Sequence, residues 1–378
     1  MVNEASNSQM TALGLMSGTS RDGIDAAIIR TDGISILEHG PSATTTYGDD
    51  FRARLSNLIA GIGDVSEVES ELTARHADLV NELIQKNNLT NSDIDIIGFH
   101  GHTILHTPNE HRTDQIGDGA LLSKMTGIAV ANDLRSADVA VGGQGAPLAP
   151  AYHWALARNL PKPVAILNLG GVANITWIGE DHSNSVMSEA GGDLIPQIWA
   201  FDTGPGNALL DDWAAKHIGA RFDRDGELAS VGSVNSPVLE QLLQNPYFSL
   251  PPPKSLDRDA FSLEPLRDLP PQDGAATLAA FTAQAVCEAA HLLPSEPLRW
   301  LVTGGGRYNK AVMEELATRL GKTVEPVEVA GWDGNVLEAE AFAYLAVRVV
   351  KQWPLSWPTT TGVARPCVGG VIHRPPSC

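Results

Sequence analysis

Residues 11–30 read TALGLMSGTSRDGIDAAIIR. Two apolar runs flank a turn made of Gly, Ser, Thr and Asp, which predicts a pair of strands with a polar tip. Residues 163–179 read PVAILNLGGVANITWIG and predict the same strand, glycine turn and strand. Because this unit occurs once in each half and no short tandem repeat exists, the sequence predicts a duplicated α/β unit, with a ligand in the cleft between the copies.

The length of the chain predicts two domains. It has 378 residues, more than one ordinary core requires, and its hydrophobic fraction of 43% supplies apolar surface for two cores. A glycine-rich loop, VGGQGAPLAP at 141–150, suggests the boundary. We expect residues 1–140 plus 351–378 to form the first domain and residues 141–350 to form the second.

Helices are expected where apolar residues recur at helical spacing, within 49–88, 276–293 and 336–350. The Pro/Gly-rich tail is expected to pack back on the first domain. Residues 245–273 are rich in Pro, Asp and Ser, and we expect them to form an excursion over the surface.

Composition excludes several classes of protein. The formal net charge is −19 and no Lys/Arg-rich run exists, so a nucleic-acid partner is not expected. The 3 cysteines provide neither a disulfide framework nor a zinc spacing. The N-terminal stretch has no apolar signal segment and no run of apolar residues is long enough to span a membrane, so the expected location is the cytoplasm.

The turn SGTSRDGID, residues 17–25, has the composition of a phosphate-binding loop. Small residues allow the backbone to approach phosphate closely, and the hydroxyls of Ser17, Thr19 and Ser20 can bind its oxygens. Asp22 and Asp25 cannot contact phosphate without a cation, so Asp22 is the candidate ligand for Mg²⁺, through water. The alternative is an ordinary hairpin turn that uses these residues for their dihedral angles.

Two further glycine turns follow apolar strands. NLGGVANIT, 168–176, places the free N–H groups of Gly170 and Gly171 at a strand end, although a plain β-turn would look the same. TGGGRYN, 303–309, would let the backbone lie flat against a base or ribose, with Asn309 as a hydrogen-bonding group. Neither a dinucleotide fingerprint nor a GxxxxGK[ST] loop is present.

FDTGPGN, 201–207, supplies the candidate base. An apolar strand ends at Asp202 and a Gly-Pro-Gly turn leads into a helix, a place where a general base often lies. Asp202 could instead be a turn or N-cap residue, but Asn207 lies closer to the expected cap.

Four such glycine turns, each at the end of an apolar strand, match in order and spacing the phosphate and adenosine motifs of actin-like ATPases. The chain resembles the anhydro-N-acetylmuramic acid kinase family over nearly its whole length. MSGTSRDGID and GGQGAPL are the most diagnostic segments, and the other resembling segments are GFHGHTILHTP, NDLR, LNLGGVANIT, FDTGPGNALLDDW, VTGGGRYN, VLEAEAFAYLAVR and TGVARPCVGGVI.

The resemblance implies a fold and a set of ligands. It implies two actin-like (ribonuclease H-like) α/β domains, each with a mixed five-stranded sheet flanked by helices, with ATP in the interdomain cleft, Mg²⁺ as cofactor and a homodimeric assembly. The residues matching the nucleotide motifs are Gly18, Thr19, Ser20, Arg21, Asp22, Gly23, Ile24, Asp25, Asn168, Gly170, Gly171, Asn174, Gly204, Gly206, Gly304, Gly305, Gly306 and Asn309.

The resemblance also implies a reaction. 1,6-Anhydro-N-acetylmuramic acid, ATP and water would give N-acetylmuramic acid 6-phosphate and ADP, a step of peptidoglycan recycling. Because O6 of an anhydro sugar carries no proton, the base is needed for the water that attacks C1, and Asp202 matches that role. Glu338 matches a family position near the reacting centre, where it would orient the water or the bridge oxygen. A solvated helix face is the alternative for Glu338.

The remaining matches lie on the sugar side, and they are His100, Gly101, Asp133, Arg135, Gln144 and Gly145. Arg135 could pair with a phosphate or with the lactyl carboxylate. His100 could instead be a structural loop histidine, and Asp133 half of a structural salt bridge. Two other functions stay open: a levoglucosan kinase, which shares these motifs, and a non-catalytic ATP-binding regulator, against which the intact Asp202 argues.

Overall fold

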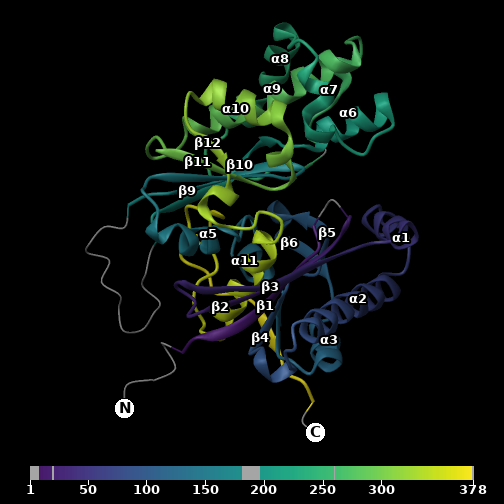
Figure 1. The fold of residues 1–378 in the computed structure, drawn as a ribbon, viewed down its shortest axis with the longest axis vertical. Helices are drawn as coiled ribbons and strands as arrows, with labels where there is room; N and C mark the ends of the chain where they lie inside the picture. The colour runs from purple at the N-terminus through teal and green to yellow at the C-terminus, as the bar shows by residue number, and fades with distance from the viewer. Residues whose placement is uncertain (1–7, 19–20, 181–195, 259, 377–378) are drawn as a thin grey trace. The chain divides into compact units, whose positions relative to one another are not determined.

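The computed structural model describes residues 8–18, 21–180, 196–258 and 260–376, and they form two compact units (Figure 1). The first unit contains the described residues up to 158 and from 336 onward. The second contains residues 159–180 and 197–335.

These divisions differ from the expected domain boundaries at 140 and 350. Helices α5 (Pro150–Leu156) and α11 (Leu337–Val350) were assigned by sequence to the second domain, but both lie in the first unit. The physical reason is burial: α11 packs against the central sheet of the first unit, and α5 packs against α11. The glycine-rich loop at 141–150 is therefore an internal loop of the first unit.

The first unit is built on a six-stranded sheet in the described part of the chain, in the order β13-β7-β4-β1-β2-β3. Strands β1, β2 and β3 form an antiparallel meander, and β4 and β7 continue parallel to β1. The elements of this unit, besides α5 and α11, are β1 (Met10–Met16), β2 (Gly23–Thr31), β3 (Ile36–Thr46), α1 (Asp49–Ile59), α2 (Val65–Lys86), β4 (Ile96–Phe99), β5 (His102–Thr107), β6 (Arg112–Ile116), α3 (Gly119–Thr126), β7 (Val130–Asn132), α4 (Ser136–Ala140) and β13 (Val371–His373).

The second unit repeats the topology, in the order β10-β9-β8-β11-β12. Again a three-stranded antiparallel meander is followed by two strands parallel to the first. Its elements are β8 (Val164–Leu169), β9 (Val172–Ile178), β10 (Ile198–Pro205), α6 (Ala208–Ile218), α7 (Glu227–Ser230), α8 (Ser236–Leu243), α9 (Pro271–Ala290), β11 (Arg299–Thr303), α10 (Lys310–Leu320) and β12 (Val324–Pro326).

The shared order confirms the predicted fold class. The second unit has the expected mixed five-stranded sheet with flanking helices, and the first unit has the same five-stranded arrangement with β13 added as a sixth strand at its edge. Both predicted strand-turn-strand units are present, as β1–β2 and β8–β9. The predicted return of the tail is also confirmed, because β13 pairs with β7. Gly127 ends α3 in the left-handed conformation, which glycine adopts without the steric cost of a side chain.

Strand β1 separates two packing layers of the first unit. Because successive side chains of a strand point to opposite faces, Leu13 and Leu15 enter a core that they share with Leu72, Val80 and other residues of α2. Gly14, between them, faces the opposite side, where α11 packs. The sheet is therefore covered by α2 on one face and by α11 on the other (Figure 1).

A row of small residues allows α11 to lie directly on the sheet. Ala27, Gly14, Gly98 and Ala131 are in register across β2, β1, β4 and β7. A Cβ on Gly14 would lie 1.8 Å from the Ala339 carbonyl oxygen. A Cβ on Gly98 would likewise lie 2.0 Å from the Phe342 carbonyl oxygen. Glycine is required at both positions because helix backbone occupies the place of a side chain.

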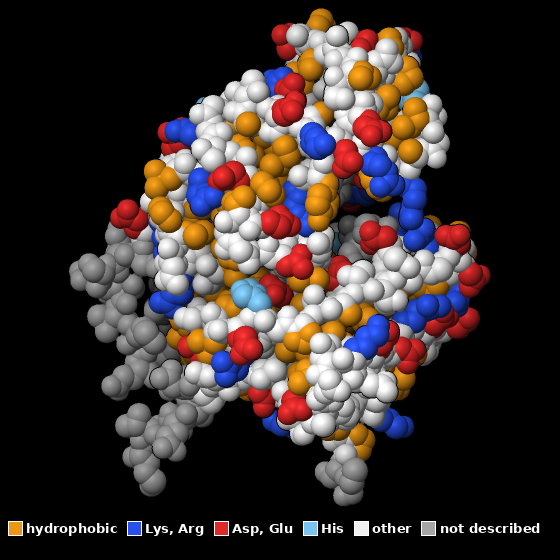
Figure 2. Space-filling view, in the orientation of Figure 1, with side chains coloured by type: hydrophobic (Ala, Val, Ile, Leu, Met, Phe, Trp, Pro, Cys, Tyr) orange, Lys and Arg blue, Asp and Glu red, His pale blue; other side chains and the backbone are white. Residues whose placement is uncertain are grey.

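The second unit buries its own core, in which Leu167, Phe201, Trp213, Phe281 and Trp300 are almost inaccessible to solvent. Among the described residues, no helix is long and apolar enough to cross a membrane. On the face shown in Figure 2, Lys and Arg side chains lie among Asp and Glu side chains instead of forming one continuous basic area.

We predict that Gly14→Ala destabilises the protein by about 3 kcal/mol, because the added methyl group collides with the α11 backbone. Gly48→Ala is the matched control, since a Cβ there meets nothing within 4 Å, and it should cost less than about 1 kcal/mol. Denaturant unfolding of both variants measures the difference. Equal stability of the two would contradict the close approach of α11 to β1.

Candidate functional site

A row of polar residues crosses the sheet of the second unit. Asp202 on β10 pairs with Asn174 on β9, and Asn174 pairs in turn with Asn168 on β8. In-register residues point to the same face, with their Cβ atoms about 5 Å apart. Asn168 also lies next to the last residue of β11, Thr303, so the row marks the carboxyl ends of the parallel strands. The predicted base and two predicted nucleotide residues thus share one surface.

Asp202 occupies an irregular position in β10. The register shifts between Asp202 and Gly204, which indicates a β-bulge, a feature common beside active sites. The N–H of Leu256 donates to Asp202 Oδ2 at 2.8 Å, and among the described residues Oδ1 accepts no hydrogen bond. Burial raises the pKa of Asp202 to about 7, although the Leu256 N–H acts in the opposite direction. The carboxyl group can therefore exchange a proton near neutral pH.

The glycine turns of the second unit lie against one another. The N–H groups of Gly206 and Asn207 donate to the carbonyl oxygens of Gly171 and Gly170, at 2.9 and 2.7 Å. Asn207 Nδ2 also donates to the Leu169 carbonyl at 2.8 Å. These bonds fix the turn after β8 to the turn before α6. Asn207 is the N-cap residue of α6, which leaves Asp202 free of that role.

The predicted nucleotide glycines fall into two groups. A Cβ on Gly206 or Gly304 would collide with neighbouring protein atoms, at 2.2 Å from the Gly170 carbonyl and 2.4 Å from Asn168 Oδ1 respectively; Gly306 is similarly enclosed. A Cβ on Gly170 or Gly305 would have its nearest protein atom at 3.5 or 3.9 Å. At these two glycines, and at Gly171, the protein leaves room above the backbone for a ligand.

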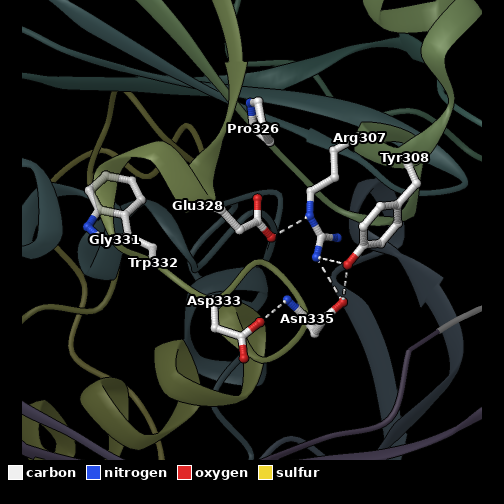
Figure 3. Close-up of a pocket in the computed structure, with 8 residues that line it drawn as sticks. All are labelled: Arg307, Tyr308, Pro326, Glu328, Gly331, Trp332, Asp333 and Asn335. Atoms are coloured by element: carbon white, nitrogen blue, oxygen red, sulfur yellow. Dashed lines mark hydrogen bonds and ion pairs between the residues drawn. The ribbon is translucent and has the colours of Figure 1, made fainter.

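A pocket of about 620 Å³ adjoins the glycine turn at residues 304–306 (Figure 3). The buried guanidinium of Arg307 forms one wall, and it donates to Glu328 Oε1 at 2.9 Å, to the Gly304 carbonyl at 2.9 Å and to Asn335 Oδ1 at 2.8 Å. Tyr308 lies over the guanidinium at 4.0 Å. Trp332 lies on the other side of the pocket from Tyr308 (Figure 3), so two aromatic rings frame it.

Two predicted nucleotide residues of this unit have structural partners. Asn309 is buried and caps α10, accepting from the Val312 N–H at 3.1 Å and donating to the Asp223 carbonyl at 3.4 Å. Gly204 lies against α9, where its Cβ would be 2.8 Å from that of Ala285. Their assignment to the nucleotide stays a prediction.

The first phosphate loop joins β1 to β2. Thr19 and Ser20 lie outside the described residues. Ser17 is buried, and its Oγ is 2.7 Å from the Tyr47 hydroxyl and 3.0 Å from His102 Nδ1. Burial, with the charge of Arg21, lowers the pKa of His102 to about 4, so this histidine is neutral at physiological pH.

The remaining predicted residues of this loop differ in exposure. Asp22 is exposed, whereas Ile24 is part of the core. Arg21 has φ of 56° and its N–H donates to the Gly18 carbonyl at 3.0 Å, which closes the turn. Asp25 Oδ1 accepts from Thr44 at 2.6 Å, and Gly23 has no room for a Cβ beside Thr45. Of the two carboxylates, that of Asp22 is the more exposed to solvent.

Arg135 is held by the predicted sugar-side residues. His100 Nδ1 donates to the Gly101 carbonyl at 3.0 Å, so its Nε2 accepts from Arg135 Nε at 3.1 Å. Arg135 Nη1 donates to the Gly145 carbonyl at 2.7 Å. Burial, with the charge of Arg135, lowers the pKa of His100 well below its ordinary value. The ring is therefore neutral, and its Nε2 can accept a hydrogen bond. Burial lowers the pKa of Arg135 to about 10, so it remains a cation.

Asp138, which the sequence analysis did not select, organises this loop. Its buried carboxylate accepts from the Gly145 N–H at 2.7 Å, from Thr361 Oγ1 at 2.6 Å and from Ser356 Oγ. Because Gly145 then binds Arg135, Asp138 fixes the guanidinium indirectly. Its position within the apolar run of SADVAV was the available signal for a buried carboxylate.

The other sugar-side residues are more loosely connected. Asp133 is exposed with φ of 51°, and it lines a polar pocket of about 250 Å³ together with His100, Asn132 and Gln115. The Gln144 N–H donates to the Thr361 carbonyl at 2.6 Å. No ion pair of Asp133 is found among the described residues.

Glu338 lies in the first turn of α11 and is exposed. Its charge raises the pKa of Arg135, against the larger effect of burial, so the two side chains influence one another. The first unit therefore brings Arg135, His100 and Gly145 into hydrogen-bonding contact, and Glu338 acts on Arg135 electrostatically. Asp202 belongs to the other unit.

A family model described as anhydro-N-acetylmuramic acid kinase matches residues 10–375. The chain belongs to the anhydro-N-acetylmuramic acid kinase family. The relatives called anhydro-N-acetylmuramic acid kinase include one from Rhodospirillum rubrum, 53% identical, with 97% of this chain and 94% of the relative covered. Another, from Paramagnetospirillum magneticum, is 51% identical, with 97% and 100% covered.

Membership of this family confirms the resemblance carried by the glycine turns and by GGQGAPL. The protein is a kinase, and a small sugar as substrate is consistent with the family to which it belongs. The residues of the two units described above are thus candidates for the kinase site.

We predict that Asp202→Asn raises the melting temperature by an amount that grows as pH rises from about 4 to 7 and then levels off. The raised pKa means that folded Asp202 retains a proton between about pH 4 and 7 that the unfolded chain has lost, so ionisation costs stability as pH rises through this window. Asparagine removes that cost and still offers an acceptor to Leu256. Thermal unfolding at several pH values measures the effect, and a difference independent of pH would contradict the raised pKa.

Proposed function

We propose that this protein converts 1,6-anhydro-N-acetylmuramic acid, ATP and water to N-acetylmuramic acid 6-phosphate and ADP. Water would attack C1 as its proton passes to Asp202. The C1–O6 bond would break, and O6 would form a bond to the γ-phosphorus as ADP leaves. The reaction would serve peptidoglycan recycling and amino sugar catabolism in the cytoplasm, carried out by a homodimer.

The observation that carries this proposal is the state of Asp202. A general base works best when its pKa lies near the working pH, and burial raises the pKa of Asp202 to about 7. With Oδ2 bound to the Leu256 N–H, Oδ1 is the oxygen available to accept the proton of water. Burial also raises the pKa of Asp211 of α6 to about 7. Asp202 differs from it in position, because it lies in register with Asn174 and Asn168 at the carboxyl ends of the parallel strands, and this placement together with the pKa favours the role of base.

The nucleotide would bind to the second unit. Gly170, Gly171 and Gly305 leave room for phosphate and ribose above the backbone, and the pocket framed by Tyr308 and Trp332 would accept the base. The expected location of ATP between the two domains stays a prediction.

The metal would bind near the first phosphate loop. The exposed carboxylate of Asp22 suits Mg²⁺, which usually takes one or two carboxylates together with phosphate oxygens and water. Mg²⁺ would neutralise charge on the phosphates. Among the described residues no cluster of three acidic, His or Cys side chains could hold a metal alone, so Asp22 would act with the phosphates and water.

The sugar would bind to the first unit. Arg135, a partly buried cation held by His100 and Gly145, is proposed to receive the lactyl carboxylate through charge-assisted hydrogen bonds. Glu338, close enough to influence Arg135, would orient the water or the bridge oxygen. A levoglucosan molecule has no carboxylate for Arg135, and the names of the relatives do not favour that alternative.

The proposal is tested by product analysis in ¹⁸O-labelled water with anhydro-N-acetylmuramic acid, levoglucosan or glucose as acceptor. We expect rapid phosphorylation of the first sugar alone, with label at C1 and none in the phosphoryl group. Preformed product incubated in labelled water corrects for exchange at C1. Preferred phosphorylation of glucose or levoglucosan, or unlabelled C1, would overturn the reaction.

In the same assay, Asp202→Asn should reduce kcat by at least about 10³-fold, because the amide cannot accept the proton of water. Its affinity for ATP, measured by calorimetry, should change less than about twofold. Turnover near that of the wild type would remove Asp202 from the role of base.

Gly305→Ala should raise the Kd for ATP at least about tenfold while leaving the melting temperature unchanged, because its methyl group would fill space meant for the ligand. Gly304→Ala is the contrasting variant. With φ of 78° and Asn168 Oδ1 at 2.4 Å from the added Cβ, it should lose about 2 kcal/mol of stability. Normal ATP binding by Gly305→Ala would exclude this turn from the nucleotide site.

A further inference from the structure

The segment 247–256, which sequence analysis predicted to be a surface excursion, is hydrogen-bonded to Asp202 at three points. The Tyr247 hydroxyl donates to the Asp202 carbonyl oxygen at 2.5 Å. The Asp202 N–H donates to the Lys254 carbonyl at 3.0 Å. The Leu256 N–H donates to Asp202 Oδ2 at 2.8 Å. One segment therefore fixes both backbone groups and one carboxylate oxygen of the same residue.

Lys254 closes this segment on itself. Its ammonium group donates to the carbonyl oxygens of Tyr247 and Phe248 at 3.1 and 3.5 Å, and it lies 4.5 Å above the ring of Tyr247. Only 7% of Lys254 is exposed, and burial lowers its pKa. Among the described residues no carboxylate lies within ion-pair distance of Lys254. Burying an ammonium group without a counter-charge costs free energy of folding, so a lysine at this position indicates a specific role within the segment.

We propose that Lys254 and Tyr247 are positioning residues for the base of the kinase reaction. Lys254 fixes the main chain of Tyr247 and Phe248. The Tyr247 hydroxyl and the Leu256 N–H then hold Asp202 at the β-bulge so that Oδ1 alone receives the proton. The inference rests on the proposed role of Asp202 and adds the residues that set its orientation.

The electrostatics agree with this arrangement. Burial, with the charge of Asp202, raises the pKa of Tyr247 above its ordinary value, so its hydroxyl stays protonated and remains a donor. The Leu256 N–H stabilises the ionised form of Asp202 and partly offsets its burial. If the segment loosened, this bond would weaken and the pKa of Asp202 would rise further.

The segment also has an anchor that does not involve Asp202. The ring of Phe248 packs against Phe261 and against Phe281 of α9, with centroids 5.7 and 5.9 Å apart. Removing a single hydroxyl group from Tyr247 should therefore leave the segment folded. This separates a positioning role from a purely structural one.

The test uses Tyr247→Phe and Lys254→Met in the full-length protein. We expect kcat to fall about tenfold and the KM for ATP to change less than about twofold, because losing one hydrogen bond alters the orientation of Asp202. The acid limb of the kcat/KM profile should move to higher pH, because the ionised form of Asp202 is then less stabilised. Lys254→Arg, which keeps the cation, should recover part of kcat.

Tyr344→Phe is the matched control. The Tyr344 hydroxyl also donates to a backbone carbonyl, that of Gly33, at 2.7 Å, but in the first unit. It should lower the melting temperature by a similar amount and leave kcat and the pH profile unchanged. If Tyr247→Phe behaves as Tyr344→Phe does, with kcat and the acid limb of the wild type, the positioning role is overturned.

A second measurement needs no substrate. The pH dependence of the difference in melting temperature between the protein and its Asp202→Asn variant follows the titration of Asp202. When both proteins also carry Tyr247→Phe, the midpoint of this pH dependence should move to higher pH. An unchanged midpoint would refute the inference. Failure of the wild-type protein to phosphorylate the anhydro sugar would refute only the proposed function, because this readout is independent of turnover.

Discussion

The structure depends on close packing between backbone segments at glycine residues, where no side chain separates the two segments. In the first unit Gly14 and Gly98 let α11 rest on the sheet, which places Glu338 at the start of that helix beside Arg135. In the second unit Gly206 and Gly304 let three turns pack on the ends of β8 and β11. Even one methyl group at these positions would separate the elements, so the sites on both units rest on the absence of a Cβ atom.

Asp202 shows how such a scaffold supports chemistry at a cost in stability. A carboxyl group in solvent would be fully ionised at neutral pH, but burial beside the bulge of β10 raises its pKa to about 7. In the proposed reaction, this destabilising burial would provide a base that can take a proton and release it near neutral pH. The first unit buries charge differently: Arg135 and Asp138 are satisfied by several hydrogen bonds each, and they form a rigid polar framework.

Much of this could be predicted from sequence. The two strand-turn-strand units, the main helices and the return of the tail followed from local patterns, and family membership followed from the glycine turns together with the diagnostic segments MSGTSRDGID and GGQGAPL. The domain boundaries did not follow, because α11 carries an apolar face that would suit either sheet, and only the small residues of β1 and β4 select one. Lys254 and Tyr247 were missed since no local pattern connects residues 247–256 with an aspartate at position 202.

The sequence by itself determined the elements, the repeated topology and the chemical identity of the candidate groups, since propensity, alternation and turn composition are local properties. Tertiary structure alone decided which glycines support packing and which leave room for a ligand. It also decided which aspartates, Asp202 and Asp211, would have a pKa near neutrality. Both depend on the atoms that surround a residue in space, and segments distant in sequence supply those atoms.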